Sequence, residues 1–213
     1  MFEIEYRGGN AVVITTKKST IAIDPKRSSF GHEDITEKGA VELATESTFL
    51  TGSPNYQISL EGPGEYEVSD FAIKGIPACR HLDDPKTACL LSNIYTITID
   101  DIKICVFGNT HADLAETQLD ELGPVDILII PVGGNGYTLD ATSAASITRR
   151  VDPKVVIPVH YQDPALKYEV PQDSADLFVS ELKAPVIEDR KFKLKSSTNL
   201  PESLEIHKIS FIK

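Results

Sequence analysis

The chain has 213 residues, of which 41% are hydrophobic and 25% charged, a composition typical of a soluble globular protein with a substantial core. Its formal net charge of −11 disfavours nucleic acid and anionic membrane surfaces as partners, because both are negatively charged. It contains no apolar run near the roughly 20 residues of a membrane span, and we expect no secretory signal. The three cysteines lack a CxxC spacing, which predicts reduced thiols in a cytoplasmic protein.

The first half of the chain is rich in short segments of alternating apolar and polar residues, which predict β-strands. Glycine and Lys-Lys-Ser turns separate the earliest of them. A polar stretch, 26–47, is expected to form a loop with a short helix. The predicted strands lie at 2–8, 10–16, 19–25 and 48–52, with two or three more within 57–81 and a hairpin over 92–109 that turns at Asp100-Asp101.

In the second half, predicted strands alternate with predicted helices. Gly123 is expected to end the first helix, and Asp140 to cap the second. Alternating lysines within 190–197 indicate an exposed edge strand. The helices are predicted at 113–123, 139–151 and 172–184, and the strands at 125–134, 154–161, 190–197 and 203–213. The pattern favours a layered α/β protein that forms a single domain over 1–213.

Three strands end in residues that suit a functional site, at Asp24-Pro25, at Gly108-Asn109 and at His160. Four motifs surround these ends. They are GGNAVVITTKKSTIAIDP (8–25), GPGEYEV (62–68), VDILIIPVGG (125–134) and PKVVIPVHY (153–161). Their order and spacing over residues 1–165 resemble the metallo-β-lactamase superfamily, most closely the branch of L-ascorbate-6-phosphate lactonase-like proteins and predicted zinc-dependent hydrolases.

This resemblance implies a four-layer αββα sandwich with an active site at one edge. It also implies one or two metal ions, most often zinc, which lower the pKa of a bound water toward roughly 7 and stabilise the developing oxyanion during hydrolysis. The superfamily's last and middle histidine ligands fall on His160 and His81, and its bridging aspartate falls on Asn109. An amide carries no charge with which to neutralise two cations.

The central Thr-His-x-His-x-Asp-His motif of the superfamily is expected after the predicted strand that ends near Leu50. Thr51 then matches the threonine of the motif. The ligand positions fall on Gly52, Pro54, Tyr56 and Gln57, none of which replaces a histidine or carboxylate. A conventional two-metal site is therefore not supported by the sequence.

Two interpretations of the remaining polar residues stay open. His160 either serves the fold, hydrogen-bonded to a neighbouring loop, or is a surviving ligand. His111 and Asp113 either join His81, Asp83, Asp84, His160 and Asp24 in a mononuclear metal site, or Asp113 simply caps the following helix. The residues expected to line the pocket are Asp24, Thr51, Asn109, Gly133, Gly134 and Tyr161, the two glycines for their backbone conformation.

Two functions follow from these interpretations. The first is a member of the hydrolase superfamily that has lost most metal ligands, needs no cofactor, and binds a small molecule or a protein partner in the old cleft. The alternative is an active hydrolase of a small ester, lactone or phosphoester, with one zinc ion held by His81, His111 and His160. The sequence is compatible with a homo-oligomer and leaves the ligand and the oligomeric state open.

Overall fold

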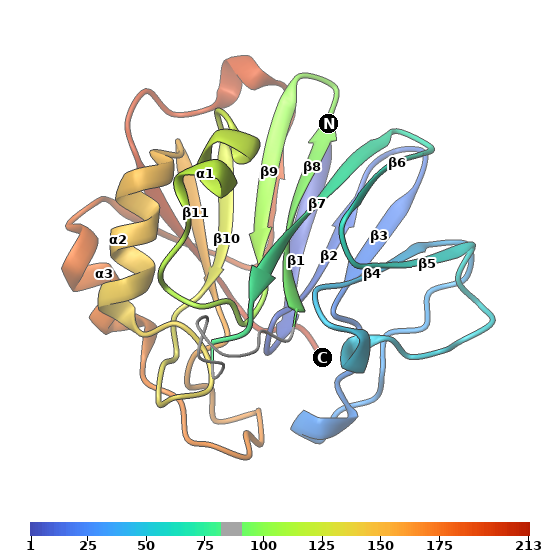
Figure 1. The fold of residues 1–213 in the computed structure, drawn as a ribbon, viewed down its shortest axis with the longest axis horizontal. Coiled ribbons are helices and arrows are strands. Elements are labelled where there is room, and N and C mark those ends of the chain that lie inside the picture. The colour runs from blue at the N-terminus through green and yellow to red at the C-terminus, as the bar shows by residue number, and fades with distance from the viewer. Residues whose placement is uncertain (82–90) are drawn as a thin grey trace.

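The computed structural model describes residues 1–81 and 91–213, whose strands form two β-sheets (Figure 1). Apolar residues from both sheets form one core cluster. The six-stranded sheet has the spatial order β13 (Phe192–Leu194), β1 (Phe2–Gly8), β2 (Ala11–Thr15), β3 (Thr20–Ile23), β4 (Val41–Ala44) and β5 (Ile58–Glu61). The eight-stranded sheet has the order β12 (Val186–Asp189), β14 (Glu205–Ile209), β11 (Val155–Val159), β10 (Ile127–Pro131), β9 (Ile102–Phe107), β8 (Leu91–Ile99), β7 (Phe71–Cys79) and β6 (Gly64–Val68).

The helices α1 (Glu116–Leu122), α2 (Ala141–Val151) and α3 (Ala175–Leu182) all lie on the side of the eight-stranded sheet (Figure 1). The Asp140 side chain caps α2 by accepting a hydrogen bond from the Ser143 backbone, as predicted. The capping role suggested for Asp113 is wrong, because α1 begins only after Ala115. None of the described helices is long and apolar enough to cross a membrane.

The outer face of the six-stranded sheet is covered by loops. The helix expected within 26–47 is replaced by a 3-10 turn at Ser28–Phe30, and β4 lies inside this stretch. Ile35, Ala40 and Tyr56 from the loops pack on small residues of the sheet, and together they form a second, smaller apolar cluster. The described part of the chain therefore has α-helices over one sheet only.

The strand predicted at 48–52 is wrong, because Ser47–Phe49 forms a 3-10 turn there. The strand that precedes the turn is β4. The charged residue Glu42 interrupts its apolar sequence, so the sequence pattern did not identify it as a buried strand. Glu42 is fully buried, and its carboxylate accepts hydrogen bonds from the Thr51 backbone and hydroxyl and from the Ser59 hydroxyl. In the sequence alone, a buried carboxylate whose hydrogen bonds are all satisfied cannot be distinguished from a carboxylate on the surface.

The strand ends that carry the site are brought together by parallel pairing. In the eight-stranded sheet β9, β10 and β11 are parallel neighbours, so their carboxyl ends meet at one edge. In the six-stranded sheet β3 and β4 are parallel as well, with Ile23 opposite Leu43. The residues that follow these five strands therefore leave both sheets in the same direction.

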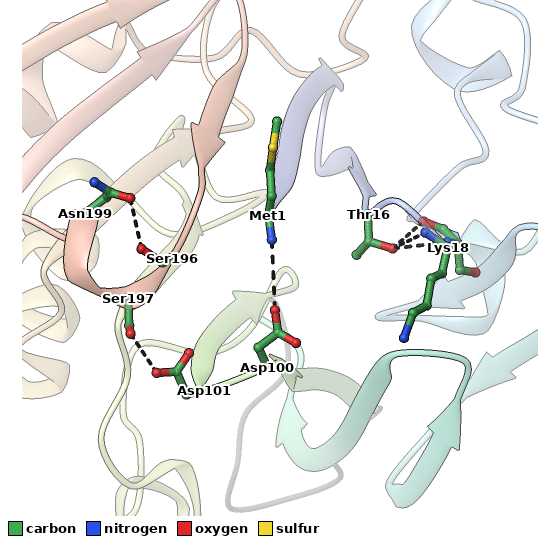
Figure 2. Close-up of polar contacts among 9 residues, drawn as sticks. Met1, Thr16, Lys18, Asp100, Asp101, Ser196, Ser197 and Asn199 are labelled. Carbon is green, nitrogen blue, oxygen red and sulfur yellow. Dashed lines mark hydrogen bonds and ion pairs between the residues drawn. The ribbon is translucent and has the colours of Figure 1, made fainter.

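The opposite end of the molecule is fastened by polar contacts of the hairpin between β8 and β9 (Figure 2). Its predicted turn is observed, with Asp100 in the left-handed conformation. The Ser197 hydroxyl donates to Asp101 at 2.6 Å, and the chain's amino terminus lies 3.9 Å from the Asp100 carboxylate. These contacts connect the turn to the first and last thirds of the chain.

The lysine-rich segment forms β13, an edge strand of the six-stranded sheet, as predicted. Lys191 pairs with Glu3 and Glu5, and Lys193 lies 3.6 Å from Glu3. These charges disfavour pairing of the edge with another strand.

One prediction about the cysteines is wrong. Cys79 is disulfide-bonded, while Cys105 is a buried free thiol in β9. The absence of a CxxC spacing does not exclude a disulfide, because a disulfide needs only two cysteines whose Cβ atoms the fold brings close together.

Candidate functional site

The candidate site lies where the five parallel strands end. Asp24 follows β3, Thr45 follows β4, and Asn109 comes shortly after β9. Gly133 comes shortly after β10, and His160 directly after β11. The buried residues of this set include Asp24, Asn109 and His160, which are 2%, 5% and 0% exposed. Polar groups at this depth require partners, and one asparagine supplies several of them.

Asn10, in the turn between β1 and β2, connects the buried polar residues. Its side-chain oxygen lies 3.0 Å from His160 Nδ1, and its nitrogen donates to Asn109 Oδ1 at 2.9 Å. Because an amide oxygen only accepts, the proton of the neutral His160 ring is on Nδ1. Nε2 is then a bare acceptor, and it has no hydrogen-bond partner in the part of the chain that the structure describes.

Burial keeps His160 neutral, because it lowers the pKa of the imidazole to about 3. Three aromatic rings hold the imidazole in place. The Tyr168 ring stacks on it with centroids 5.0 Å apart, the Tyr137 ring lies at 5.3 Å, and Phe30 meets it edge-on at 5.9 Å. The direction of Nε2 is therefore fixed by packing.

Asp24 is buried in the left-handed conformation. Its carboxylate accepts hydrogen bonds from the Thr45 backbone and hydroxyl, both at 2.7 Å, and also from the Asn10 side chain. These bonds favour the charged form, but burial outweighs them and raises the pKa of Asp24 to about 7. Through Asn10 the carboxyl group of Asp24 is coupled to the imidazole of His160.

Two small cavities adjoin this network and share Tyr137 as a wall. The first has a volume of about 50 Å³ and is lined by Glu46, Arg80, His81, Asn109 and Tyr137. The second, about 40 Å³, lies beside His160 and is lined mainly by aromatic residues. We call them the Arg80 cavity and the His160 cavity.

The Arg80 cavity contains an ion pair. The Arg80 guanidinium lies 3.8 Å from the carboxylate of Glu46, which is 8% exposed. Next to it, the His81 backbone donates to the Asn109 carbonyl at 2.7 Å. The cavity therefore combines a cation, a carboxylate, an imidazole and an amide.

The three histidines proposed as ligands are distributed over the site. The His81 and His111 rings lie close together, with centroids 6.4 Å apart, whereas His160 lines the other cavity. Burial and the neighbouring His111 lower the pKa of His81. Among the residues described here, no group of three or more His, Cys, Asp or Glu side chains is arranged to hold a metal ion. Asp83 and Asp84 lie outside the described residues.

A family model for the beta-lactamase superfamily domain matches residues 3–160. The chain belongs to the beta-lactamase superfamily. A UPF0173 metal-dependent hydrolase of Thermococcus onnurineus is 32% identical over 99 residues, 46% of this chain and 44% of that protein. The chain thus spans less than half the length of this relative. A second UPF0173 metal-dependent hydrolase, from Lysinibacillus sphaericus, is 24% identical over a match that covers 81% of this chain and 93% of that protein.

The solved structures similar to this member of the beta-lactamase superfamily agree with the predicted fold. A Thermotoga maritima protein described as a Zn-dependent hydrolase of the metallo-beta-lactamase superfamily superimposes with a TM-score of 0.76, at 21% identity. The superposition covers 99% of this chain and all of the other. The metallo-β-lactamase fold is confirmed, with two mixed sheets and three helices. Among the described residues, loops take the place of the helical layer that the αββα arrangement predicts over the six-stranded sheet.

The loop expected to carry the central motif begins earlier in the chain than the sequence suggested. The strand before it, β4, ends at Ala44, so Thr45 rather than Thr51 directly follows a strand. Sequence reasoning missed Glu46 and Arg80. The available signal for Glu46 was the segment VELAT, residues 41–45, which can be interpreted as an apolar strand with one interior carboxylate, Glu42. Glu46 is the residue that directly follows this segment.

Three residues expected in the pocket have other contacts. Thr51 binds Glu42 through its backbone and hydroxyl at 2.7 Å and anchors the loop that follows β4. The Tyr161 hydroxyl donates to the Ile209 carbonyl at 3.3 Å, and its ring stacks on Tyr6. Gly134 adopts the left-handed conformation, with φ of 64°, in the loop after β10.

Replacing Thr51 by alanine removes a hydrogen bond to a buried carboxylate. We expect a loss of about 1–2 kcal/mol in the free energy of unfolding, measured by urea denaturation. Thr48→Ala, at an exposed position of the same loop, is the matched control and is expected to cost less than about 0.5 kcal/mol. Equal stability of the two variants would contradict the anchoring role.

Proposed function

We propose that this protein binds a small ligand in its two adjoining cavities and does not hydrolyse substrates by the two-metal route of its superfamily. One observation carries the proposal: Arg80 and Glu46 form an ion pair in the wall of the Arg80 cavity. The positive charge in the cavity is thus a side chain. The small volumes of the cavities, about 50 and 40 Å³, limit what each can enclose to a group of a few heavy atoms, which excludes a segment of a protein partner.

The residues present do not fit two divalent cations. We place the central motif directly after β4, with Thr45 as its threonine, so that its ligand positions fall on Glu46, Thr48, Leu50 and Thr51. Only Glu46 among them carries a group that binds zinc well, and Arg80 competes for that carboxylate. Asn109, in place of the bridging aspartate, has no charge and already accepts a hydrogen bond from Asn10. A guanidinium beside the site also repels an incoming cation. This donor set supports ligand binding by hydrogen bonds and charge.

A second candidate function is supported by the two neighbouring histidines. The His81 and His111 ring centroids are 6.4 Å apart, and a movement of about 1 Å toward one another would let both imidazoles bind one tetrahedral zinc ion. His81 Nδ1 has no hydrogen-bond partner within the described ranges. A single zinc ion held there would supply Lewis-acid activation for hydrolysis of a small ester, lactone or phosphoester.

Metal content distinguishes the two functions. We expect the protein, purified without chelator or metal-binding tag, to contain far less than one transition-metal ion per chain by elemental analysis. We also expect its thermal midpoint to be indifferent to added zinc. One ion per chain that disappears in His81→Ala but persists in His207→Ala would instead establish the single-metal hydrolase. Two ions per chain that depend on His160 would contradict the proposal altogether.

A further inference from the structure

We infer that the His160 cavity binds a small organic ammonium group, of about the size of methylammonium, as one end of the ligand proposed above. This inference rests on the proposed function, because it uses His160 as a hydrogen-bond acceptor. It rests on three properties of the cavity, namely its volume, its acceptor atoms and its surrounding charge. The residues that supply them are Phe30, Tyr137, His160, Tyr168, Glu169 and Gln172.

The volume limits the group that the cavity can hold. About 40 Å³ is several times the minimum for one water, which is roughly 10–15 Å³ on the same measure. A head group of two or three heavy atoms fits this space, whereas a sugar or a nucleobase does not. The neighbouring Arg80 cavity, across Tyr137, leaves room for a further part of the ligand.

Two residues that line the cavity each carry an acceptor atom without a donor. His160 Nε2 and Gln172 Oε1 are both buried, and neither has a hydrogen-bond partner among the residues that the structure describes. The orientation of the Gln172 amide is fixed, because its nitrogen donates to the Val170 carbonyl at 2.8 Å. Buried acceptors are nearly always satisfied in folded proteins, so a ligand for this cavity should present two N–H groups.

The surroundings favour a cation over a neutral donor. The rings of Tyr137 and Tyr168 line the cavity, and aromatic rings attract cations. Burial raises the pKa of Tyr137, and the carboxylates of Glu46, Glu169 and Asp24 raise it further, while Arg80 opposes them. Negative charge therefore outweighs positive charge at the wall shared by the two cavities. An ammonium group satisfies both the acceptors and this charge.

A transition metal suits the cavity less well. An imidazole and one neutral amide are only two of the ligands that such an ion normally requires. An anion is disfavoured by both acceptors and by the nearby carboxylates.

The test measures stabilisation of the intact protein by methylammonium chloride. We expect the thermal midpoint to rise with methylammonium concentration beyond the effect of sodium chloride at the same ionic strength. Methanol, a neutral donor of similar size, and tetramethylammonium, which has no N–H group and is too large, are expected to have no such effect. Stabilisation by methanol equal to that by methylammonium would overturn the assignment of a cation, and no difference between methylammonium and sodium chloride would overturn the inference.

Two variants locate the site. Gln172→Met removes one acceptor at nearly constant volume and is expected to weaken methylammonium binding at least fivefold, while Gln162→Met, at an exposed position, leaves it unchanged. If Gln172→Met does not fold, methylammonium binding by Glu169→Gln tests the inference instead. It is expected to weaken binding severalfold, in contrast to Glu67→Gln, which makes the same change of net charge on β6. Equal binding by the members of either pair would overturn the inference.

Failure of this experiment is distinguishable from failure of the proposed function. Absence of both bound metal and methylammonium binding overturns only the ammonium assignment. A stoichiometric metal ion that depends on His160 overturns both, because His160 Nε2 would then be a metal ligand.

Discussion

Asp24→Asn is expected to become progressively more stable than the wild-type protein as the pH rises from about 5 to about 8. Burial raises the pKa of the Asp24 carboxyl from 3.8 to about 7, so the folded protein holds its proton more tightly than the unfolded chain does. The stability that the carboxyl contributes is therefore complete below pH 3.8, its unfolded value, and is lost as the pH rises toward 7. The asparagine variant has no such dependence.

His160→Asn is expected to reveal the opposite slope. Burial lowers the pKa of His160 from 6.5 to about 3, so the unfolded chain binds a proton more tightly than the folded protein. The stability contributed by the neutral imidazole is complete above pH 6.5 and is lost as the pH falls toward 3. Asparagine tolerates the left-handed conformation of residue 160, which has φ of 50°.

The two effects oppose each other in the wild-type protein between about pH 4 and 6.5. Urea denaturation of the wild type and both variants at several pH values measures them separately, because all other groups cancel in the differences. Between the two ends of its own window, the stability of each variant relative to wild type should change by roughly 4–5 kcal/mol, with opposite sign for the two variants. Parallel pH profiles for all three proteins would show that neither group has a shifted pKa.

The second large effect is expected for Gly133→Ala. A Cβ atom on Gly133 would approach the His160 carbonyl oxygen and Gln172 Oε1 to less than 3.0 Å, which real Cβ atoms do not do. The carbonyl belongs to a buried backbone segment that follows β11 and cannot move aside cheaply. We expect a loss of about 3 kcal/mol or more in the free energy of unfolding, measured by chemical denaturation.

Gly136→Ala is the matched control for this prediction. Gly136 is in the same loop and has φ of 74°, but a Cβ atom there meets nothing within 4 Å. Only the strain of the left-handed backbone remains, and we expect a cost of about 1 kcal/mol. If the two variants were equally stable, close packing around Gly133 would not be what requires a glycine.

Much of the fold could be predicted because the relevant strands and turns have local signatures. β10 and β11 are buried on both faces and appear as continuous apolar runs, and the Asp140 cap precedes an amphipathic helix. β4 could not be recognised, since its Glu42 is polar in sequence but buried and satisfied by residues far along the chain. The strand was therefore predicted at 48–52 instead of 41–44, and Thr51 rather than Thr45 was placed at its end.

The site was less predictable than the fold because its parts depend on contacts between distant segments. His160 and Asn109 were identified from their strand ends, but their connection through Asn10 depends on how the two sheets pack. The ion pair of Arg80 with Glu46 likewise joins the end of β7 to the loop after β4, and no pattern within either segment of the sequence predicts it. The ring packing around His160 involves residues from three separate loops, which follow β3, β10 and β11.

The segment from Thr45 to Gln57 contributes to both the cavity and the core. Its Glu46 lines the Arg80 cavity, and its Tyr56 packs on the outer face of the six-stranded sheet. The segment is held in place by the hydrogen bonds from Thr51 to the Glu42 carboxylate. A substitution that weakens the attachment of this loop to Glu42 is therefore expected to shift the Glu46 carboxylate away from Arg80 as well. The stability of the outer cover and the charge of the cavity are not independent of one another.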